Sequence, residues 1–172
     1  KCVQFDSMKI MKQADLRSIF TGQDVVYIYH NQIDARGDKA ASENEVFTAC
    51  EEAIEEIYAL IKRLSSQANT HHFIVTADHG FIYKRDKIQA TDKISGNVSK
   101  SNSVGQRYCI STEKINSDGV CHTTVGKVLG SVDERIVSFP LASDIFKVAG
   151  AGQNYVHGGC SPQEMLVPIV DV

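Results

Sequence analysis

The stretch FIVTADHGFIY, residues 73–83, decides the fold, because an apolar run ends abruptly in an acid, an imidazole and a glycine. Its β-branched and aromatic residues predict a buried strand over 72–77. Asp78 and His79 follow at the end of that strand, and Gly80 lets the backbone turn away without crowding them. Asp and Gly also end strands for purely structural reasons, so an ordinary turn remains the alternative for this group alone.

A second stretch, VVYIYHN at 25–31, has the same character and predicts a strand that is buried on both faces. It runs into QIDARGD, which supplies Asp34 and Asp38 and in which Gly37 allows a tight turn. A short amphipathic helix is predicted before this strand, over 7–20.

A long helix is predicted between the two strands, over 43–66. Ser42 and Glu45 have the spacing of a capping box at its start. Apolar residues recur at helical spacing and are expected to face the core: Val46, Phe47, Cys50, Ile54, Ile57, Ile61 and Leu64. The glutamates of this segment mostly fill the opposite face, which favours a solvated surface over a metal cluster.

The order strand, helix, strand predicts a βαβ unit, in which the two strands are parallel and the crossover is right-handed. Parallel strands share one carboxyl edge, where open α/β folds hold their ligands. We therefore expect Asp34, Asp38, Asp78 and His79 on one rim of an α/β sheet.

Three carboxylates and an imidazole on one rim repel each other unless a cation neutralises them. Oxygen and imidazole ligands suit Mg²⁺, Mn²⁺ or Zn²⁺. The stretch GAGQNYVHGGCSPQE, 150–164, places His157 between glycines and just before a short helix start, so His157 is expected to complete the set. The alternative is that His157 is a histidine of a glycine-rich loop and binds no ligand.

Composition is ordinary for one globular domain of 172 residues, 42% hydrophobic and 23% charged. The net charge of −3 gives no global case for nucleic acid or an acidic membrane, and no apolar run reaches the length of a spanning helix. The five cysteines show no C-x-x-C spacing, which argues against a disulfide framework and a thiolate zinc site. We expect a cytoplasmic protein, and the start at Lys1 favours a piece of a longer chain.

The segment 84–107 is poor in large apolar residues and rich in Ser, Lys and Asn, which predicts a mobile loop. Because it leaves the rim directly after His79, its first residues, Lys84 and Arg85, are candidates to bind a phosphorylated substrate. A merely solvated loop is the alternative. The region 107–148 alternates like antiparallel strands and predicts a β-rich insertion within a single domain over 1–172.

The chain resembles a known family at three places. VTADHG, with its preceding strand, acid turn and helix and with His157 much later, is similar to the metal-binding core of the alkaline phosphatase superfamily. VVYIYHNQIDARGDKA, FIVTADHGFIYKRDK and GAGQNYVHGGCSPQEMLVPIV together look more closely like the PglZ domain of bacterial BREX phage-defence systems. The resemblance implies a layered α/β/α sheet of alkaline phosphatase type, present here in part.

The resemblance also implies two divalent metal ions, Zn, Mn or Mg. Asp34 and His157 match ligands of one metal, and Asp78 and His79 match ligands of the other. Asp38 stands where many superfamily phosphatases carry a histidine, and this exchange of nitrogen for oxygen favours a harder ion such as Mn²⁺ or Mg²⁺. The Ser or Thr nucleophile of the superfamily has no counterpart before Asp34, so the chain looks like the C-terminal part of the catalytic domain.

Two functional classes follow. The first is the metal-dependent core of a hydrolase acting on a phosphomonoester or on a phosphodiester such as nucleic acid, with the nucleophile outside this chain and the fragment alone inactive. The second is a non-catalytic scaffold of the phage-defence assembly with a vestigial metal site. The expected partners are the remainder of the same protein and other BREX proteins, without a membrane.

Overall fold

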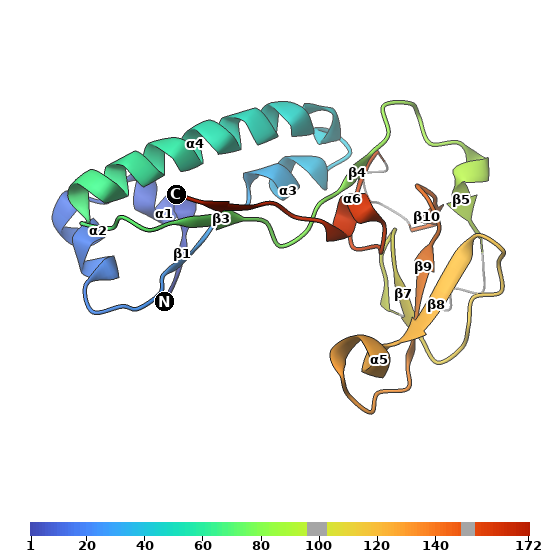
Figure 1. Ribbon diagram of the computed structural model, residues 1–172. Helices are drawn as coiled ribbons and strands as arrows, with labels where there is room; N and C mark the ends of the chain where they lie inside the picture. Colours follow the sequence, from blue (N-terminus) through green and yellow to red (C-terminus); the bar gives the residue numbers. More distant parts are fainter. Residues whose placement is uncertain (96–102, 149–153) are drawn as a thin grey trace. The chain divides into compact units, whose positions relative to one another are not determined.

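The computed structural model describes residues 1–95, 103–148 and 154–172 of a mixed α/β chain (Figure 1). The chain forms two compact units. Unit 1 consists of residues 1–37, 45–76 and 168–172, and unit 2 consists of residues 38–44 and 77–167. Each unit has its own buried apolar residues and is described by itself. Whether the two make one folding domain stays a prediction.

Unit 1 contains four short strands. β1 (Cys2–Gln4) pairs in parallel with β2 (Tyr27–Tyr29), and β3 (Ile74–Thr76) pairs antiparallel with β12 (Ile169–Asp171). The strands predicted over 25–31 and 72–77 are therefore present but shorter. Among the described residues no hydrogen-bonded ladder joins β2 to β3, so the predicted βαβ unit with two parallel strands stays a prediction.

The helices of unit 1 differ from the prediction at their ends. The single helix expected over 7–20 is two helices, α1 (Phe5–Lys9) and α2 (Gln13–Phe20). The acidic stretch expected to be a turn forms α3 (Gln32–Gly37). The long helix α4 (Val46–Gln67) follows a 3₁₀ turn, η1 (Glu43–Glu45), so its N-cap is Glu45 and not the predicted Ser42, and Glu45 makes no side-chain capping hydrogen bond.

The core of unit 1 lies between the helices and the strands. Its buried residues are Met8, Leu16, Ile19, Leu64 and Ala68. α4 runs along the strands (Figure 1) and buries Val46, Ala49 and Ala53 on the same face. Phe47 and Ile54, predicted to face the core, are 54% and 68% exposed. The buried stripe is rotated toward the small residues, because alanines let a helix approach its neighbours closely.

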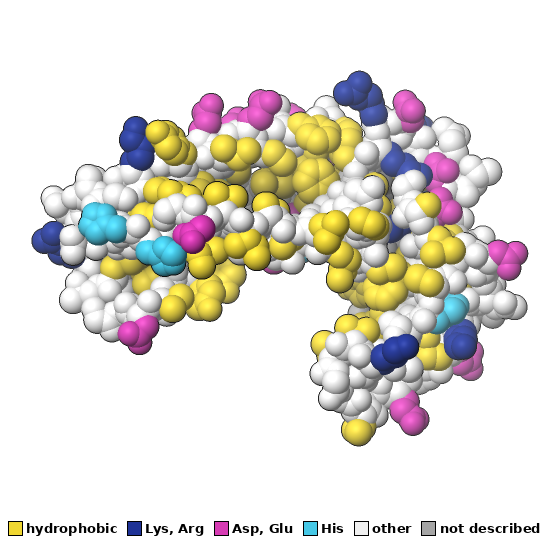
Figure 2. Space-filling model, in the orientation of Figure 1, with side chains coloured by type: hydrophobic (Ala, Val, Ile, Leu, Met, Phe, Trp, Pro, Cys, Tyr) yellow, Lys and Arg dark blue, Asp and Glu magenta, His cyan; other side chains and the backbone are white. Residues whose placement is uncertain are grey.

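The strands of unit 1 expose the side chains of one face to solvent in the part of the chain that the structure describes. Ile28 is half-buried, whereas Tyr27 and Tyr29 on either side of it are more than half exposed. Ile74 on β3 and Ile169 on β12 are also exposed, and apolar side chains show at the surface along these strands (Figure 2). The expectation of strands buried on both faces is wrong for the part of the chain described here.

Unit 2 is rich in short strands. Its largest sheet is antiparallel and has the order β6, β7, β9, β8. The four strands are β6 (Ser103–Val104), β7 (Cys109–Ser111), β9 (Ile136–Pro140) and β8 (Val120–Thr124). Two further pairs join β4 (Ile82–Tyr83) to β11 (Tyr155–Val156) and β5 (Lys93–Ile94) to β10 (Ile145–Phe146).

Within the region 107–148, predicted to alternate like antiparallel strands, β8 is followed by a helix after Thr124. The Thr124 side chain accepts a hydrogen bond from the backbone of Lys127 and caps α5 (Val125–Leu129). Gly130 ends this helix with a φ of 67°. The local cap therefore overrides the strand pattern.

The segment predicted to be a loop, 84–107, carries short elements in its described part. These are η2 (Ala90–Asp92), β5 and β6. Ile88 and Ile94 are buried, and together with the η2 turn they tie this part of the segment to unit 2. The prediction for residues 96–102 lies outside the described residues. None of the helices described has the length and apolar composition needed to cross a bilayer.

Candidate metal centre

The turn after β3 presents Asp78 and His79 through local hydrogen bonds. The backbone N–H of His79 donates to Asp78 Oδ1 at 3.0 Å. His79 Nδ1 lies 3.0 Å from the carbonyl oxygen of Gly80, which can only accept, so Nδ1 carries the proton and the lone pair is on Nε2. Nε2 lies 3.8 Å from Asp78 Oδ2. The turn therefore orients the ring so that Nε2 is the nitrogen that can accept a metal ion.

Gly80 is needed because another segment passes close to it. A Cβ atom at Gly80 would overlap the carbonyl oxygen of Gln163, in the short helix α6 (Pro162–Met165). The Gly80 N–H donates to the carbonyl of Glu164 at 2.9 Å. The turn that carries His79 is thus fixed against α6.

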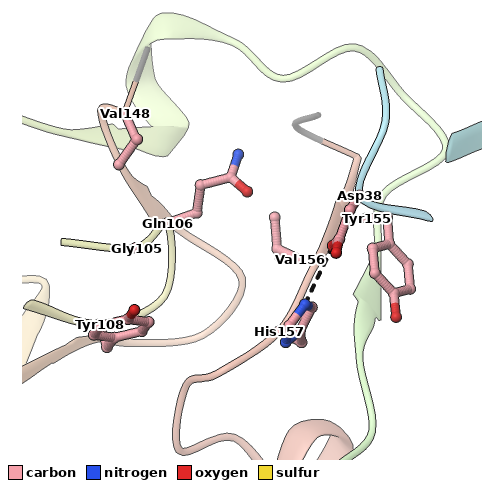
Figure 3. Close-up of a pocket in the computed structure, with 8 residues that line it drawn as sticks. All are labelled: Asp38, Gly105, Gln106, Tyr108, Val148, Tyr155, Val156 and His157. Carbon is pink, nitrogen blue, oxygen red and sulfur yellow. Dashed lines mark hydrogen bonds and ion pairs between the residues drawn. The ribbon is translucent and has the colours of Figure 1, made fainter. Parts of the chain in front are cut away.

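His157 lies directly after β11 and faces two of the predicted site residues. Its Nε2 is 3.2 Å from Asp38 Oδ1, although the two residues are 119 positions apart (Figure 3). Its ring stacks on that of His79 with centroids 4.2 Å apart and an angle of 4° between the planes. One ring nitrogen of His79 lies within 4.8 Å of one ring nitrogen of His157.

The position of His157 is set by the strand before it. β11 pairs with β4, and the Glu43 carboxylate accepts hydrogen bonds from the backbone of Asn154 at 2.8 Å and of Tyr155 at 3.3 Å. The Asn154 side chain donates in turn to the carbonyl oxygens of Lys84 and Asp86. These bonds hold β11 in place beside β4, which follows the turn that carries His79.

A buried ion pair fixes the loop after His157. Arg107 is fully buried and donates from Nε and Nη2 to the two carboxylate oxygens of Glu164, both at 2.9 Å. The same carboxylate accepts from the backbone of Gly159 at 2.9 Å and of Ser161 at 3.2 Å, and from the Ser161 hydroxyl at 2.7 Å. Arg107 also donates to the carbonyl oxygens of Ala142 and Asp144. Every side-chain nitrogen of Arg107 and both carboxylate oxygens of Glu164 therefore have a hydrogen-bond partner, supplied by one another, by the backbone or by the Ser161 hydroxyl.

The pKa of Glu164 reflects this environment. Burial alone would raise the pKa, but the hydrogen bonds from Arg107 and Ser161, together with the positive charge of Arg107, lower it below the ordinary value of 4.5. Glu164 is thus held as a carboxylate, and it closes a capping box at the start of α6.

The structure brings four of the five predicted metal residues into unit 2: Asp38, Asp78, His79 and His157. They form three neighbouring pairs, Asp38 with His157, His157 with His79, and His79 with Asp78. Asp34 lies on α3 in unit 1 and is half-buried, so its part in the site stays a prediction.

The two residues predicted to bind substrate differ in their surroundings. Lys84 Nζ lies 3.7 Å from Asp92 Oδ2 within the same segment, and Arg85 is exposed. The structure gives neither of them a contact to Asp38 or His157. Their role in substrate binding also stays a prediction.

A cavity of about 200 Å³ opens beside Asp38 and His157 (Figure 3). The remaining residues that line it are Gly105, Gln106, Tyr108, Val148, Tyr155 and Val156. The sequence pattern did not single out Gln106 or Tyr108, because they lie where a loop and a strand were expected and have no motif of their own. Glu164 was predicted only as part of a helix start, and Arg107 only as the end of a loop.

The donor set of unit 2 fits a divalent cation. Carboxylate oxygens and imidazole nitrogens are ligands that Zn²⁺ and Mn²⁺ accept in proteins. The Asp38 carboxylate lies at one nitrogen of His157, a contact of the kind that orients metal-binding histidines, so the other ring nitrogen would be the one to bind a cation. These residue types therefore suit a divalent cation, and the close pairs of carboxylate and imidazole can also exchange a proton.

Comparison with known proteins gives consistent matches. The family model described as the BREX system PglZ alkaline phosphatase-like domain matches residues 1–172. The chain is 39% identical over 168 residues to the alkaline phosphatase-like protein PglZ of Bacillus cereus (strain H3081.97), which covers 98% of this chain and 20% of that protein. It is 30% identical over 164 residues to the alkaline phosphatase-like protein BrxZ of Escherichia coli O9:H4 (strain HS), covering 94% of this chain and 19% of that protein. The chain thus spans about a fifth of the length of these curated relatives, and no solved structure matches it.

Proposed function

We propose, because this chain belongs to the family of BREX system PglZ alkaline phosphatase-like domains, that it carries most of the metal site of a phosphate-ester hydrolase. The observation that supports this proposal best is the neighbourhood of Asp38, His157 and His79 in unit 2. Three segments far apart in the sequence supply these side chains, which an ordinary strand-ending turn does not require.

The proposed ligands are those of the sequence reading, Asp34, Asp38, Asp78, His79 and His157. Asp38 has a second oxygen beside the one that accepts from His157, so it can both orient the ring and bind a cation. His79 contributes Nε2, since its Nδ1 proton is engaged by Gly80. Two divalent ions, Zn²⁺, Mn²⁺ or Mg²⁺, are proposed for this set.

The chemistry of such a site is phosphoryl transfer. When bound, the cations neutralise the phosphoryl oxygens and lower the pKa of a coordinated hydroxyl. The residues of this chain would then hold the ions in place, and the cavity beside Asp38 would receive the group that the phosphate esterifies, against Tyr108 and Gln106. Both a phosphomonoester and a phosphodiester such as nucleic acid remain substrates within the proposal.

The activity of the whole protein is a further proposal, because the chain spans about a fifth of its relatives. The nucleophile is proposed to lie outside this chain, in the remainder of the same protein. Other proteins of the BREX system are the proposed partners, in the cytoplasm.

Metal binding is the decisive measurement. We expect His157→Ala and His79→Ala to weaken binding of Mn²⁺ and Zn²⁺, followed by calorimetry, by about tenfold or more, since each removes a ligand. His72→Ala is the matched control, because His72 is an exposed histidine of unit 1 whose neighbour is Asp171. Melting curves recorded in chelator should be similar for all three variants.

Activity gives the second measurement. In the full-length protein, Asp78→Ala should abolish hydrolysis of an aryl phosphate ester with added Mn²⁺, Mg²⁺ or Zn²⁺, because it removes a proposed metal ligand. The fold should persist, because the Asp78 side chain is exposed. A chain that binds no divalent ion would overturn the hydrolase proposal in favour of a scaffold. Full metal-dependent activity of the Asp78 variant would make Asp78 a structural residue of the turn.

A further inference from the structure

Two thiols of unit 2 lie against each other. Cys121 is on β8, and Cys160 is in the loop between His157 and α6. Their Sγ atoms are 3.7 Å apart although the residues are 39 positions apart in the chain. The Cys121 thiol also lies 3.6 Å from the carbonyl oxygen of Phe139 on the neighbouring strand.

The backbone on both sides of Cys160 is fixed. The N–H groups of Gly159 and Ser161 both donate to the Glu164 carboxylate, which is itself held by Arg107. Cys121 is fixed by its place in the ladder with β9, opposite Phe139. The approach of the two sulfurs is therefore set by the fold of unit 2 on both sides.

Cys160 is open to solvent. It is exposed, and it lines a broad cavity of about 570 Å³ together with residues of β4, the turn after β9 and α6. Among the other cysteines, Cys109 is fully buried, and Cys2 and Cys50 lie in unit 1. Cys160 is thus a thiol that a small oxidant can reach and that has a second thiol beside it.

We propose that Cys121 and Cys160 form a redox modification site, which hydrogen peroxide converts to a disulfide. The sulfurs need to close from 3.7 Å to about 2.05 Å. The pair has no part in the proposed metal chemistry, and the inference stands whether or not the metal site is active.

The reaction balances in two steps. The Cys160 thiolate attacks one oxygen of the peroxide, the O–O bond breaks, and Cys160 becomes a sulfenic acid while hydroxide leaves. The Cys121 sulfur then attacks the sulfenic sulfur, the S–S bond forms, the S–O bond breaks, and a second hydroxide leaves. The two thiol protons convert the hydroxides to water, so two thiols are oxidised and one peroxide is reduced. A dithiol such as dithiothreitol reverses the change by thiol exchange.

The oxidant has to be in excess. Partial burial raises the pKa of the Cys160 thiol, and the neighbouring Cys121 acts in the same direction, so little thiolate is present at neutral pH. Treatment of the folded chain with hydrogen peroxide should still lower the number of free thiols, counted after the chain is unfolded, from five to three. Proteolysis without reduction should yield one linked peptide pair that contains Cys121 and Cys160 and has lost two hydrogen atoms.

Three variants test the assignment. Cys121→Ser and Cys160→Ser should each abolish the linked pair, whereas Cys50→Ser should leave it unchanged. In Cys121→Ser, the sulfenic acid of Cys160 should persist and be trapped by dimedone. The inference is overturned if peroxide takes Cys160 of the parent chain to a sulfinic acid with Cys121 still a free thiol, or if the linked peptides contain other cysteines.

Discussion

Replacing Glu164 by glutamine tests whether the buried ion pair holds the loop after His157. The substitution keeps the size of the side chain but removes its charge and turns one oxygen into a donor. Five donors point at the carboxylate, two at Oε1 and three at Oε2. An NH₂ group at either position therefore faces donors that it cannot accept from.

The NH₂ group of glutamine can stand at the Oε1 or at the Oε2 position, and fewer hydrogen bonds are lost at Oε1. If the NH₂ group takes the Oε1 position, the hydrogen bonds from Arg107 Nε and from the Gly159 N–H are lost. Hydrogen bonds to a charged group contribute roughly 1.5–3 kcal/mol each, and breaking one partner of a buried ion pair costs about 3–5 kcal/mol. We expect Glu164→Gln to lower the free energy of unfolding by about 3–5 kcal/mol, or the melting temperature by roughly 6–20 °C for a chain of this size.

Hydrogen exchange gives the local measurement. The amides of Gly159 and Ser161 should lose their protection in Glu164→Gln, while amides within α4 of unit 1 should keep theirs, because only the former donate to the carboxylate. Glu134→Gln is the matched control in unit 2, since Glu134 is exposed, and it should change stability by less than about 0.5 kcal/mol.

Acid adds an independent readout. Because the pKa of Glu164 is lowered in the folded chain, the Glu164 carboxylate stabilises the fold at a pH above its ordinary pKa of 4.5. This stabilisation is lost as the pH falls through the lower pKa of the folded chain. The parent chain should lose stability more steeply than Glu164→Gln below about pH 4.5. If the variant unfolds within about 1 kcal/mol of the parent and keeps protection at Gly159, the ion pair does not hold this loop.

Three other changes have defined outcomes. Gly80→Ala should lower the free energy of unfolding by about 1–3 kcal/mol, because the added Cβ overlaps a backbone carbonyl of α6. Gly119→Ala is the control, because a Cβ there meets only ordinary contacts, and equal melting temperatures for the two variants would contradict the prediction. Arg63→Ala should lower the free energy of unfolding by about 2 kcal/mol, because the Arg63 guanidinium donates to three carbonyl oxygens at and after the end of α1. Arg63→Lys should recover little of this loss, which denaturant unfolding of both variants would measure. The pKa of Glu56 is lowered mainly by the hydrogen bond from Lys9, so its carboxyl should titrate below 4.5 by NMR and rise in Lys9→Ala; an unchanged titration would exclude that hydrogen bond in solution.

The sequence predicted those elements whose signals are local. The strand before Asp78, the strand before His30 and the long helix between them were all placed within a few residues. The errors in α4 have one cause, which is that the pattern gave weight to large apolar residues. The helix instead packs with Ala49 and Ala53, and leaves Phe47 exposed.

The candidate site was predictable where the residues carry motifs. DHG and the histidine in the glycine-rich stretch were singled out, and unit 2 places His79 beside His157. Arg107 and Glu164 could not be paired from the sequence, because they are 57 positions apart and neither lies in a motif that implies the other. The same holds for the two thiols, since only the fold brings a strand of the sheet to the loop after His157.

The buried ion pair also limits how this chain can change over generations. A substitution at Arg107 or at Glu164 alone leaves one charge inside unit 2 without its partner, so most single mutational steps at these positions should destabilise the protein strongly. A joint replacement that keeps an acceptor for the Gly159 and Ser161 amides avoids that penalty. The two positions are therefore expected to vary together between lineages, and a library that randomises both at once should recover folded variants that single-site libraries miss.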